Sequence, residues 1–268
     1  MGSKPSSPNE RAKRVWSLGS YADIAPYFLG MAAHVVDATD VDAGDVVLDV
    51  GCGTGNVAIT AARRGADVTG LDIVPAMLED ARANATTADV VPIDWREGSA
   101  TDLPFDDDTF DVTRSCLGHM FADPPGTAGQ ELLRVTRSGG RLVFTSWTPG
   151  SVVSAMGAVL ADYLPPDIDT GDPPFLWGDT DVVRERLGDA VENVEFETGT
   201  VVTPVLSPTQ YWEKAATEAG MFIMALEAID DAYHPALREE MIETIGHFFD
   251  PSRNAIPMDY RLTTARMP

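Results

Sequence analysis

The chain has 268 residues, 44% of them hydrophobic, which is enough for a large buried core and favours one α/β domain over two independent ones. Its 19 basic and 42 acidic residues give a net charge of −23. Such a surface repels phosphate backbones, and no local basic patch offsets it, so nucleic acid is not expected as a partner.

The acidic residues are spread along the chain rather than gathered in one tail. High salt screens the repulsion between surface carboxylates, so this composition favours a halophilic source, for which loss of refolding or activity below about molar salt is the test. Nothing resembles a signal peptide or a membrane-spanning segment, so we expect a cytoplasmic protein without stable membrane association. Cys52 and Cys116 lie in apolar contexts that favour reduced, buried thiols over a disulfide or a cysteine metal site.

Residues 1–8 are rich in serine and proline and are expected to be disordered, whereas 9–268 are expected to form a single domain. Within it, helices over 9–44 precede a core over 45–148 in which strands and helices alternate. The expected strands are 46–50, 67–71, 90–96, 110–115 and 141–147, and the expected helices are 56–64, 75–84 and 128–136. This alternation is typical of βαβ units and predicts an α/β fold with a doubly wound, mostly parallel sheet.

The pattern of the C-terminal half, 149–268, is weaker. It predicts helices over 152–163 and 179–187, a strand over 191–202, a helical insertion over about 208–250 and a last strand over 258–267, which brings the sheet to seven strands. The insertion contains Met221-Phe-Ile-Met224 and Leu226. These apolar residues either pack in the core or roof a binding pocket.

A glycine-rich turn, Gly51-Cys-Gly-Thr-Gly55, lies between the first expected strand and the first helix of the core. Missing side chains there allow a ligand to approach the backbone closely. The spacing G-x-G-x-G does not match the dinucleotide pattern G-x-G-x-x-G, so pyrophosphate binding is the weaker interpretation. Asp49 lies two residues before the turn, where its carboxylate could hold the cation of an amino-acid group through water or the adjacent backbone.

Asp72 ends the second expected strand, 17 residues after Gly55. An ionised carboxylate at this place can accept hydrogen bonds from both hydroxyls of a ribose. Alone it could equally be a turn or helix N-terminal residue. Together with the glycine turn it predicts a site for a ribose-containing cofactor.

These motifs resemble those of class I S-adenosylmethionine-dependent methyltransferases. The resemblance covers about residues 46–147 and rests on Val47-Leu-Asp-Val-Gly-Cys-Gly-Thr-Gly55, Asp72, Glu97-Gly-Ser-Ala-Thr-Asp-Leu-Pro-Phe105, Phe110-Asp-Val-Thr113 and Leu132-Leu-Arg-Val-Thr-Arg-Ser-Gly-Gly-Arg-Leu142.

The resemblance implies S-adenosylmethionine as cofactor, S-adenosylhomocysteine as product and a set of cofactor contacts. Gly51, Gly53 and Gly55, with Cys52, would line the methionine and ribose side, Asp72 and Ile73 the ribose, Ser99 and Ala100 the adenine, and Ser115 to Leu117 the sulfonium. Ser99 departs from the family pattern, since many relatives have an aspartate there. Trp16 and Tyr21 are similar to a small-molecule branch in which N-terminal helices cover the cofactor, and are otherwise core aromatics of an amphipathic helix.

His119 is the candidate general base, because it follows the fourth expected strand and histidine titrates near neutral pH. A loop histidine with no catalytic role is the other interpretation. No His, Cys or carboxylate spacing suggests a metal ion, so none is expected.

Three functions remain open from the sequence. The first is methyl transfer to a small-molecule acceptor by in-line displacement, the second is methylation of a quinone or lipid precursor, and the third is cofactor binding without turnover. An NAD-dependent dehydrogenase is disfavoured by the glycine spacing.

Overall fold

The structure, a computed structural model, describes residues 7–90, 92–166, 168 and 171–268. Its central sheet has seven strands in the order β3-β2-β1-β4-β5-β7-β6. The first five of these are parallel, and β7 runs antiparallel to both of its neighbours. The strands are β1 (Val46–Val50), β2 (Asp67–Asp72), β3 (Asp94–Glu97), β4 (Phe110–Cys116), β5 (Thr136–Trp147), β6 (Glu192–Pro204) and β7 (Ala255–Arg266). The predicted fold class is confirmed.

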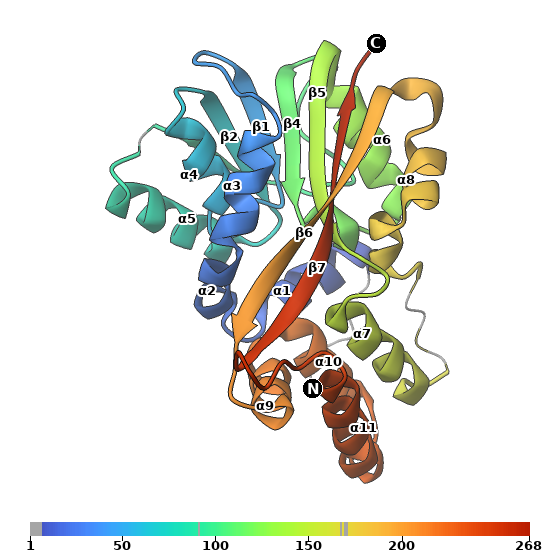
Figure 1. Ribbon diagram of the computed structural model, residues 1–268. Helices are drawn as coiled ribbons and strands as arrows, with labels where there is room; N and C mark the ends of the chain where they lie inside the picture. Colours follow the sequence, from blue (N-terminus) through green and yellow to red (C-terminus); the bar gives the residue numbers. More distant parts are fainter. Residues whose placement is uncertain (1–6, 91, 167, 169–170) are drawn as a thin grey trace.

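Helices cover both faces of the sheet (Figure 1). From β1 the chain adds β2 and β3 on one side and β4 and β5 on the other. Because each connection between parallel strands is right-handed, the helices of these two halves lie on opposite faces of the sheet. The helices of the first two thirds of the chain are α1 (Pro8–Ser17), α2 (Tyr21–Ile24), α3 (Leu29–Asp37), α4 (Asn56–Ala62), α5 (Pro75–Thr87), α6 (Pro125–Val135), α7 (Val152–Tyr163) and α8 (Thr180–Leu187). β1 and β4 are buried along almost their whole length, as strands in the middle of a parallel sheet should be.

The strands β6 and β7 form a long ribbon that extends past the carboxyl ends of the parallel strands (Figure 1). The predicted insertion between them consists of α9 (Pro208–Glu218), α10 (Gly220–Ala228) and α11 (His234–Gly246). These helices gather at the end of the ribbon, and α11 packs against α7. The insertion therefore lies at the sheet edge where doubly wound proteins bind their ligands.

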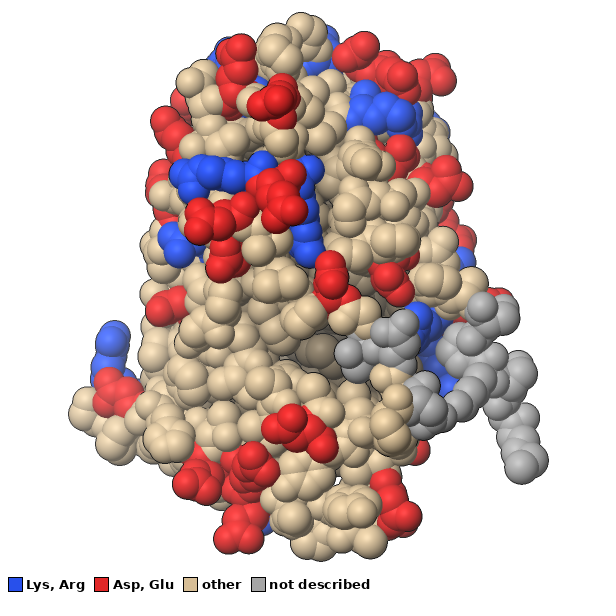
Figure 2. Space-filling model, turned by 90° about the vertical axis from the view of Figure 1, so that its right-hand side faces the viewer, with Lys and Arg blue, Asp and Glu red and all other residues tan. Residues whose placement is uncertain are grey.

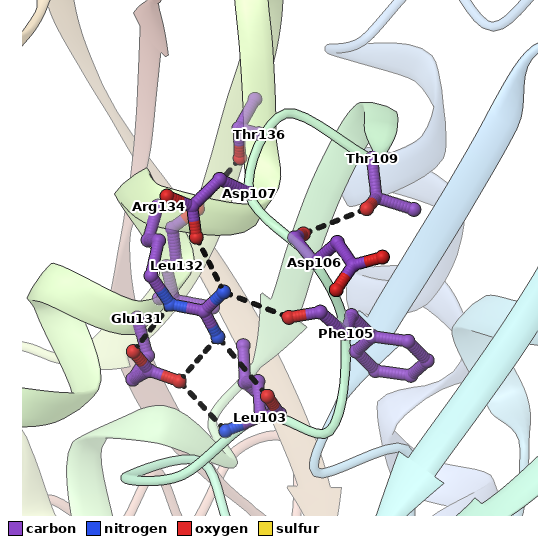
Figure 3. Close-up of polar contacts among 9 residues, drawn as sticks. All are labelled: Leu103, Phe105, Asp106, Asp107, Thr109, Glu131, Leu132, Arg134 and Thr136. Atoms are coloured by element: carbon purple, nitrogen blue, oxygen red, sulfur yellow. Dashed lines mark hydrogen bonds and ion pairs between the residues drawn. The ribbon is translucent and has the colours of Figure 1, made fainter.

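One arginine anchors the loop between β3 and β4 (Figure 3). Arg134 on α6 donates to the carbonyl oxygens of Phe105 and Leu103 at 2.7 and 3.0 Å and to Asp107, while Glu131 accepts from both Arg134 and the backbone N–H of Leu103. These bonds lower the pKa of Glu131. The motifs Glu97–Phe105 and Leu132–Leu142 are thus joined by one side chain.

Several expected boundaries differ from the structure, among them the start of the first helix and the start of the third strand. Ser7 and Pro8 are ordered, because Ser7 Oγ accepts from the N–H of Glu10 and the Glu10 carboxylate accepts from the N–H of Ser7, a capping box that starts α1. Residues 1–6 lie outside the described residues. The expected strand 90–96 begins only at Asp94, where pairing with β2 begins.

Acidic side chains are scattered over the face shown in Figure 2 and alternate with the few basic ones. In the described part of the chain, no helix has the length and apolarity needed to span a membrane. The same residues contain no group of three or more His, Cys, Asp or Glu side chains placed to hold a metal ion. Cys52 and Cys116 are free thiols.

Candidate active site

The glycine turn holds backbone angles that other residues rarely adopt. Gly51, Gly53 and Gly55 have φ values of +66°, +51° and +89°. A Cβ atom on Gly51 would lie 2.7 Å from the Cα of Gly118, the glycine that follows β4. The loops after β1 and β4 therefore meet backbone to backbone, which is possible only with glycine at both positions.

Asp72 joins the end of β2 to this turn. One carboxylate oxygen accepts from the N–H of Gly53 at 2.8 Å and the other from the N–H of Val74 at 2.9 Å. The residue is 8% exposed. Burial raises the pKa of Asp72, and the backbone N–H groups that it accepts from oppose the shift. Asp72 and the glycine turn, which together predicted a cofactor site, are thus directly hydrogen-bonded to each other.

A cavity of about 410 Å³ opens in front of Asp72 and the turn. Most of the residues predicted to bind the cofactor line it: Trp16, Tyr21, Gly51, Gly53, Asp72, Ile73, Ser99 and Ala100. Cys116, Leu117 and Gly118, at the end of β4, line it as well.

Four residues predicted as cofactor contacts lie outside the cavity wall: Asp49, Cys52, Gly55 and Ser115. Asp49 is 1% exposed, and one of its oxygens accepts from the N–H of Ala58 in the first turn of α4. Burial raises the pKa of Asp49 to about 7 against the opposing field of Arg114. Its other oxygen is buried without a hydrogen-bond partner among the described residues, so an effect on an amino-acid group through water or the adjacent backbone stays a prediction.

The other three also have structural surroundings. Ser115 is fully buried, donates to the carbonyl oxygen of Val50 at 2.7 Å and accepts from the N–H of His119 at 2.9 Å. Cys52 is buried, and burial raises the pKa of its thiol. Gly55 faces the ring of Trp95. These three residues support the glycine turn and the end of β4 on the side away from the cavity. At the end of β4, Cys116 lines the cavity and Ser115 does not.

The N-terminal helix closes the side of the cavity near Ser99. Asn9 and Ala12 of α1 belong to the wall, and Ser99 Oγ donates to the side-chain oxygen of Asn9 at 3.0 Å. Ser99 also accepts from the backbone N–H of Thr101 at 3.2 Å. The hydroxyl that stands where many relatives have an aspartate is therefore ordered by both the core and the N-terminal helix.

Three aromatic rings pack around the middle of the cavity. Trp16 makes edge contacts with Tyr21, at 6.0 Å between ring centroids, and with Phe121, at 4.8 Å. A Cβ atom on Gly53 would lie 3.3 Å from the Tyr21 ring, so the missing side chain makes room for this ring. Burial raises the pKa of Tyr21, and the acidic groups of Cys116, Asp72 and Asp49 add to the shift.

His119 does not reach the cavity, and its predicted role as general base is corrected. It is completely buried, with its ring 4.6 Å from Phe144 and 4.8 Å from Trp177. Neither ring nitrogen has a hydrogen-bond partner among the described residues. Burial, helped by Arg186, lowers the pKa of His119 to about 3. A neutral imidazole enclosed in aromatic rings cannot accept a proton from an acceptor molecule.

Of the far half of the cavity, only residues 221–224 and Leu226 were named from the sequence, and Met221 and Phe222 among them line the wall. Tyr27 and Phe28 line it from the N-terminal helices, Trp147 from β5, and Thr203 and Met258 from the β6–β7 ribbon. The insertion adds Tyr211, Lys214, Glu218, Met221 and Phe222. One cavity thus runs from the glycine turn to the insertion.

Comparison with known proteins agrees with this geometry. Residues 48–144 match the family described as methyltransferase domain. An uncharacterised protein of Mycobacterium tuberculosis is 35% identical over 201 residues, which are 74% of this chain and 73% of that one. The chain belongs to the methyltransferase family.

Within this family, the chain also matches a demethylmenaquinone methyltransferase of Paenarthrobacter aurescens, with 39% identity over 114 residues, 42% of this chain and 43% of that one. Two solved structures share the fold. The YcgJ protein of Bacillus subtilis has a TM-score of 0.60 at 17% identity and covers 89% of this chain and 98% of its own. A geranyl diphosphate methyltransferase in complex with S-adenosylmethionine has a TM-score of 0.51 at 21% identity, covering 90% and 85%. The predicted class I methyltransferase resemblance is confirmed.

Proposed function

We propose that this methyltransferase uses S-adenosylmethionine to methylate a small-molecule acceptor and releases S-adenosylhomocysteine. The observation that carries the proposal is the single cavity that connects Asp72 and the glycine turn to the aromatic residues of the insertion. Its volume of about 410 Å³ is in the range of small-molecule sites. The net charge of −23 disfavours a nucleic-acid acceptor.

The residues around the first half of the cavity fit this cofactor. Each oxygen of Asp72 accepts one backbone N–H, and a carboxylate oxygen can accept a second bond, so both can still receive a ribose hydroxyl. Gly51, Gly53 and the Tyr21 ring line the cavity where the methionine portion would lie. Ser99 and Ala100 would contact the adenine. The bound cofactor would supply an electrophilic methyl group.

The protein's contribution to the reaction would be alignment and exclusion of water. In-line displacement from a sulfonium needs the acceptor atom on the far side of the methyl group and little else. Among the described residues that line the cavity, none is a histidine. We therefore propose an acceptor that reacts without a histidine base, with the insertion over the acceptor site.

A quinone or lipid-precursor acceptor is the second candidate, and the match to a demethylmenaquinone methyltransferase favours it. The cytoplasmic location and the absence of stable membrane association remain predictions. Stimulation of turnover by detergent or membranes would favour the second candidate over a water-soluble acceptor.

The test of the cofactor site is calorimetric titration with S-adenosylmethionine, S-adenosylhomocysteine and NAD. We expect the first two to bind, and Asp72→Ala to weaken them by about 1.5–3 kcal/mol, the range for hydrogen bonds to a charged group. Asp67→Ala, at the exposed opposite end of the same strand, is the matched control and should bind like the wild type. Binding of NAD alone, or equal weakening by both substitutions, would overturn the proposed site.

A further inference from the structure

The half of the cavity that faces the insertion is apolar and enclosed. Trp147, Val205, Phe222 and Met258 line it and are each less than 9% exposed. A polar ligand group placed among them would lose its water, so any such group needs a partner in the wall.

Two hydroxyl groups in this wall have only a weak partner. Tyr211 on α9 donates to the thioether sulfur of Met258 at 3.4 Å, and Thr203 on β6 donates to the same sulfur at 3.9 Å. Among the described residues, neither hydroxyl has a nitrogen or oxygen partner. Thr203 is 9% exposed, and burial raises the pKa of Tyr211 to about 12, so both remain protonated donors. A thioether is a poor acceptor, and a ligand oxygen would replace it favourably.

The charges of the residues that line this half of the cavity cancel. Lys214 and Glu218 lie one turn apart on α9 with 3.4 Å between the ammonium nitrogen and a carboxylate oxygen. Lys214 also lies over the ring of Tyr27, 5.5 Å from its centroid. Gln210, the other polar residue here, uses its side-chain oxygen to accept from the backbone N–H of Leu206 at 2.7 Å. The charges of the wall thus cancel, and Tyr211 and Thr203 are the two hydroxyls in it whose hydrogen bond goes to a sulfur atom.

We infer that the acceptor is an uncharged, mainly apolar molecule with one hydrogen-bond-accepting oxygen, which the hydroxyls of Tyr211 and Thr203 hold in place of the Met258 sulfur. This rests on the proposed function, because it takes the first half of the cavity to be the cofactor's. Tyr211 and Thr203 are positioning residues that select the acceptor, and no proton transfer is assigned to them.

Three bicyclic probes of one size separate the contributions: tetralin has no oxygen, 1-tetralone adds one carbonyl oxygen, and tetralin-1-carboxylate adds a negative charge. Each is titrated into the full-length protein by calorimetry, with and without S-adenosylhomocysteine. Two hydrogen bonds worth roughly 0.5–1.5 kcal/mol each predict that 1-tetralone binds about 5- to 140-fold more tightly than tetralin. The carboxylate should bind most weakly, because the site has no net positive charge.

The variants follow from the geometry. Tyr211→Phe should lower the affinity for 1-tetralone about fivefold and leave tetralin unchanged, which also shows that the cavity is intact. Met258→Leu removes the competing sulfur and should keep the preference for the ketone. Tyr233→Phe, at an exposed tyrosine of the same insertion, is the matched control.

Titration of S-adenosylhomocysteine alone in the same samples tests the proposed function separately, since its loss contradicts the cofactor site whatever the probes do. Four results would overturn the inference about the acceptor: equal binding of tetralin and 1-tetralone, tightest binding of the carboxylate, no binding of any probe, or a ketone preference that Tyr211→Phe leaves undiminished. A ketone preference that Tyr211→Phe lowers about fivefold and Tyr233→Phe leaves unchanged would support it.

Discussion

His119 illustrates how one backbone turn decides the role of a side chain. The chain leaves β4 through Leu117, whose φ is +64°, and a short 3-10 turn, His119–Phe121, follows. This turn sends Phe121 toward the cavity and the imidazole between Phe144 and Trp177. The histidine is therefore a core residue whose ionisation would place an uncompensated charge among aromatic rings.

Its buried neutral state makes folding sensitive to acid. The pKa is lowered from 6.5 to about 3, so below pH 6.5 the unfolded chain takes up a proton that the folded protein does not, and stability falls as the pH falls. This costs about 2 kcal/mol between pH 7 and pH 5. In His119→Leu, the decrease in the free energy of unfolding from pH 7 to pH 5, measured by urea unfolding, should be smaller by that amount. An identical pH dependence in the variant and the wild type would contradict the burial of a neutral ring.

The residues that could be predicted from the sequence are those whose place follows from the backbone alone. Asp72 ends a strand next to a glycine turn, and that position faces the ligand in any doubly wound sheet. Asp49 and Ser115 could not be placed, because neighbouring residues of a strand point to opposite faces and a difference of one residue changes the side. Tyr211, Thr203 and Met258 carried no signal, since they converge from separate elements.

At the scale of elements, we expect α1 to act as a cover over the cavity, attached in part by its charged residues. It has no buried residue. Its Arg11, Lys13 and Arg14 form ion pairs with Asp123 after β4, Glu97 at the end of β3 and Glu227 on α10. One exposed helix thus connects the cofactor side, the end of β4 and the insertion, and the cofactor is expected to enter when it lifts.

Neutralising these three cations should loosen the cover. Exposed ion pairs contribute roughly 0.2–1 kcal/mol each, so replacing Arg11, Lys13 and Arg14 by Gln should speed dissociation of S-adenosylhomocysteine by about threefold or more, an effect that high salt reproduces in the wild type. Stopped-flow displacement measures it. Arg238→Gln, which removes an exposed pair between α11 and α9, is the control. If control and triple variant release the product equally fast, α1 is not the cover.

The order of elements was predictable almost throughout, because the spacing of apolar residues within each strand or helix of the core is typical of that element. The insertion was predictable as helical for the same reason. Its place over the acceptor site was predicted only from its apolar residues, because the exact position depends on the length of the β6–β7 ribbon, and β7 begins at Ala255 rather than at Met258 as expected.

The whole molecule combines an acidic surface with a mainly apolar cavity. The net charge of −23 is scattered over the surface, whereas the far half of the cavity is lined by aromatic and aliphatic groups. A large net charge favours solubility and disfavours phosphate-rich partners, and it has no part in the chemistry of the enclosed site. The expected dependence of folding on molar salt stays a prediction.

The central claim is that one cavity holds the methyl donor and a small acceptor together. The most direct measurement is transfer of label from methyl-labelled S-adenosylmethionine to a low-molecular-weight extract. We expect label in an organic-extractable product with the wild type, at least about tenfold less with Asp72→Ala, and undiminished labelling with Asp67→Ala. Saturable cofactor binding with no label in any small molecule would contradict the claim and identify a cofactor-binding protein without turnover.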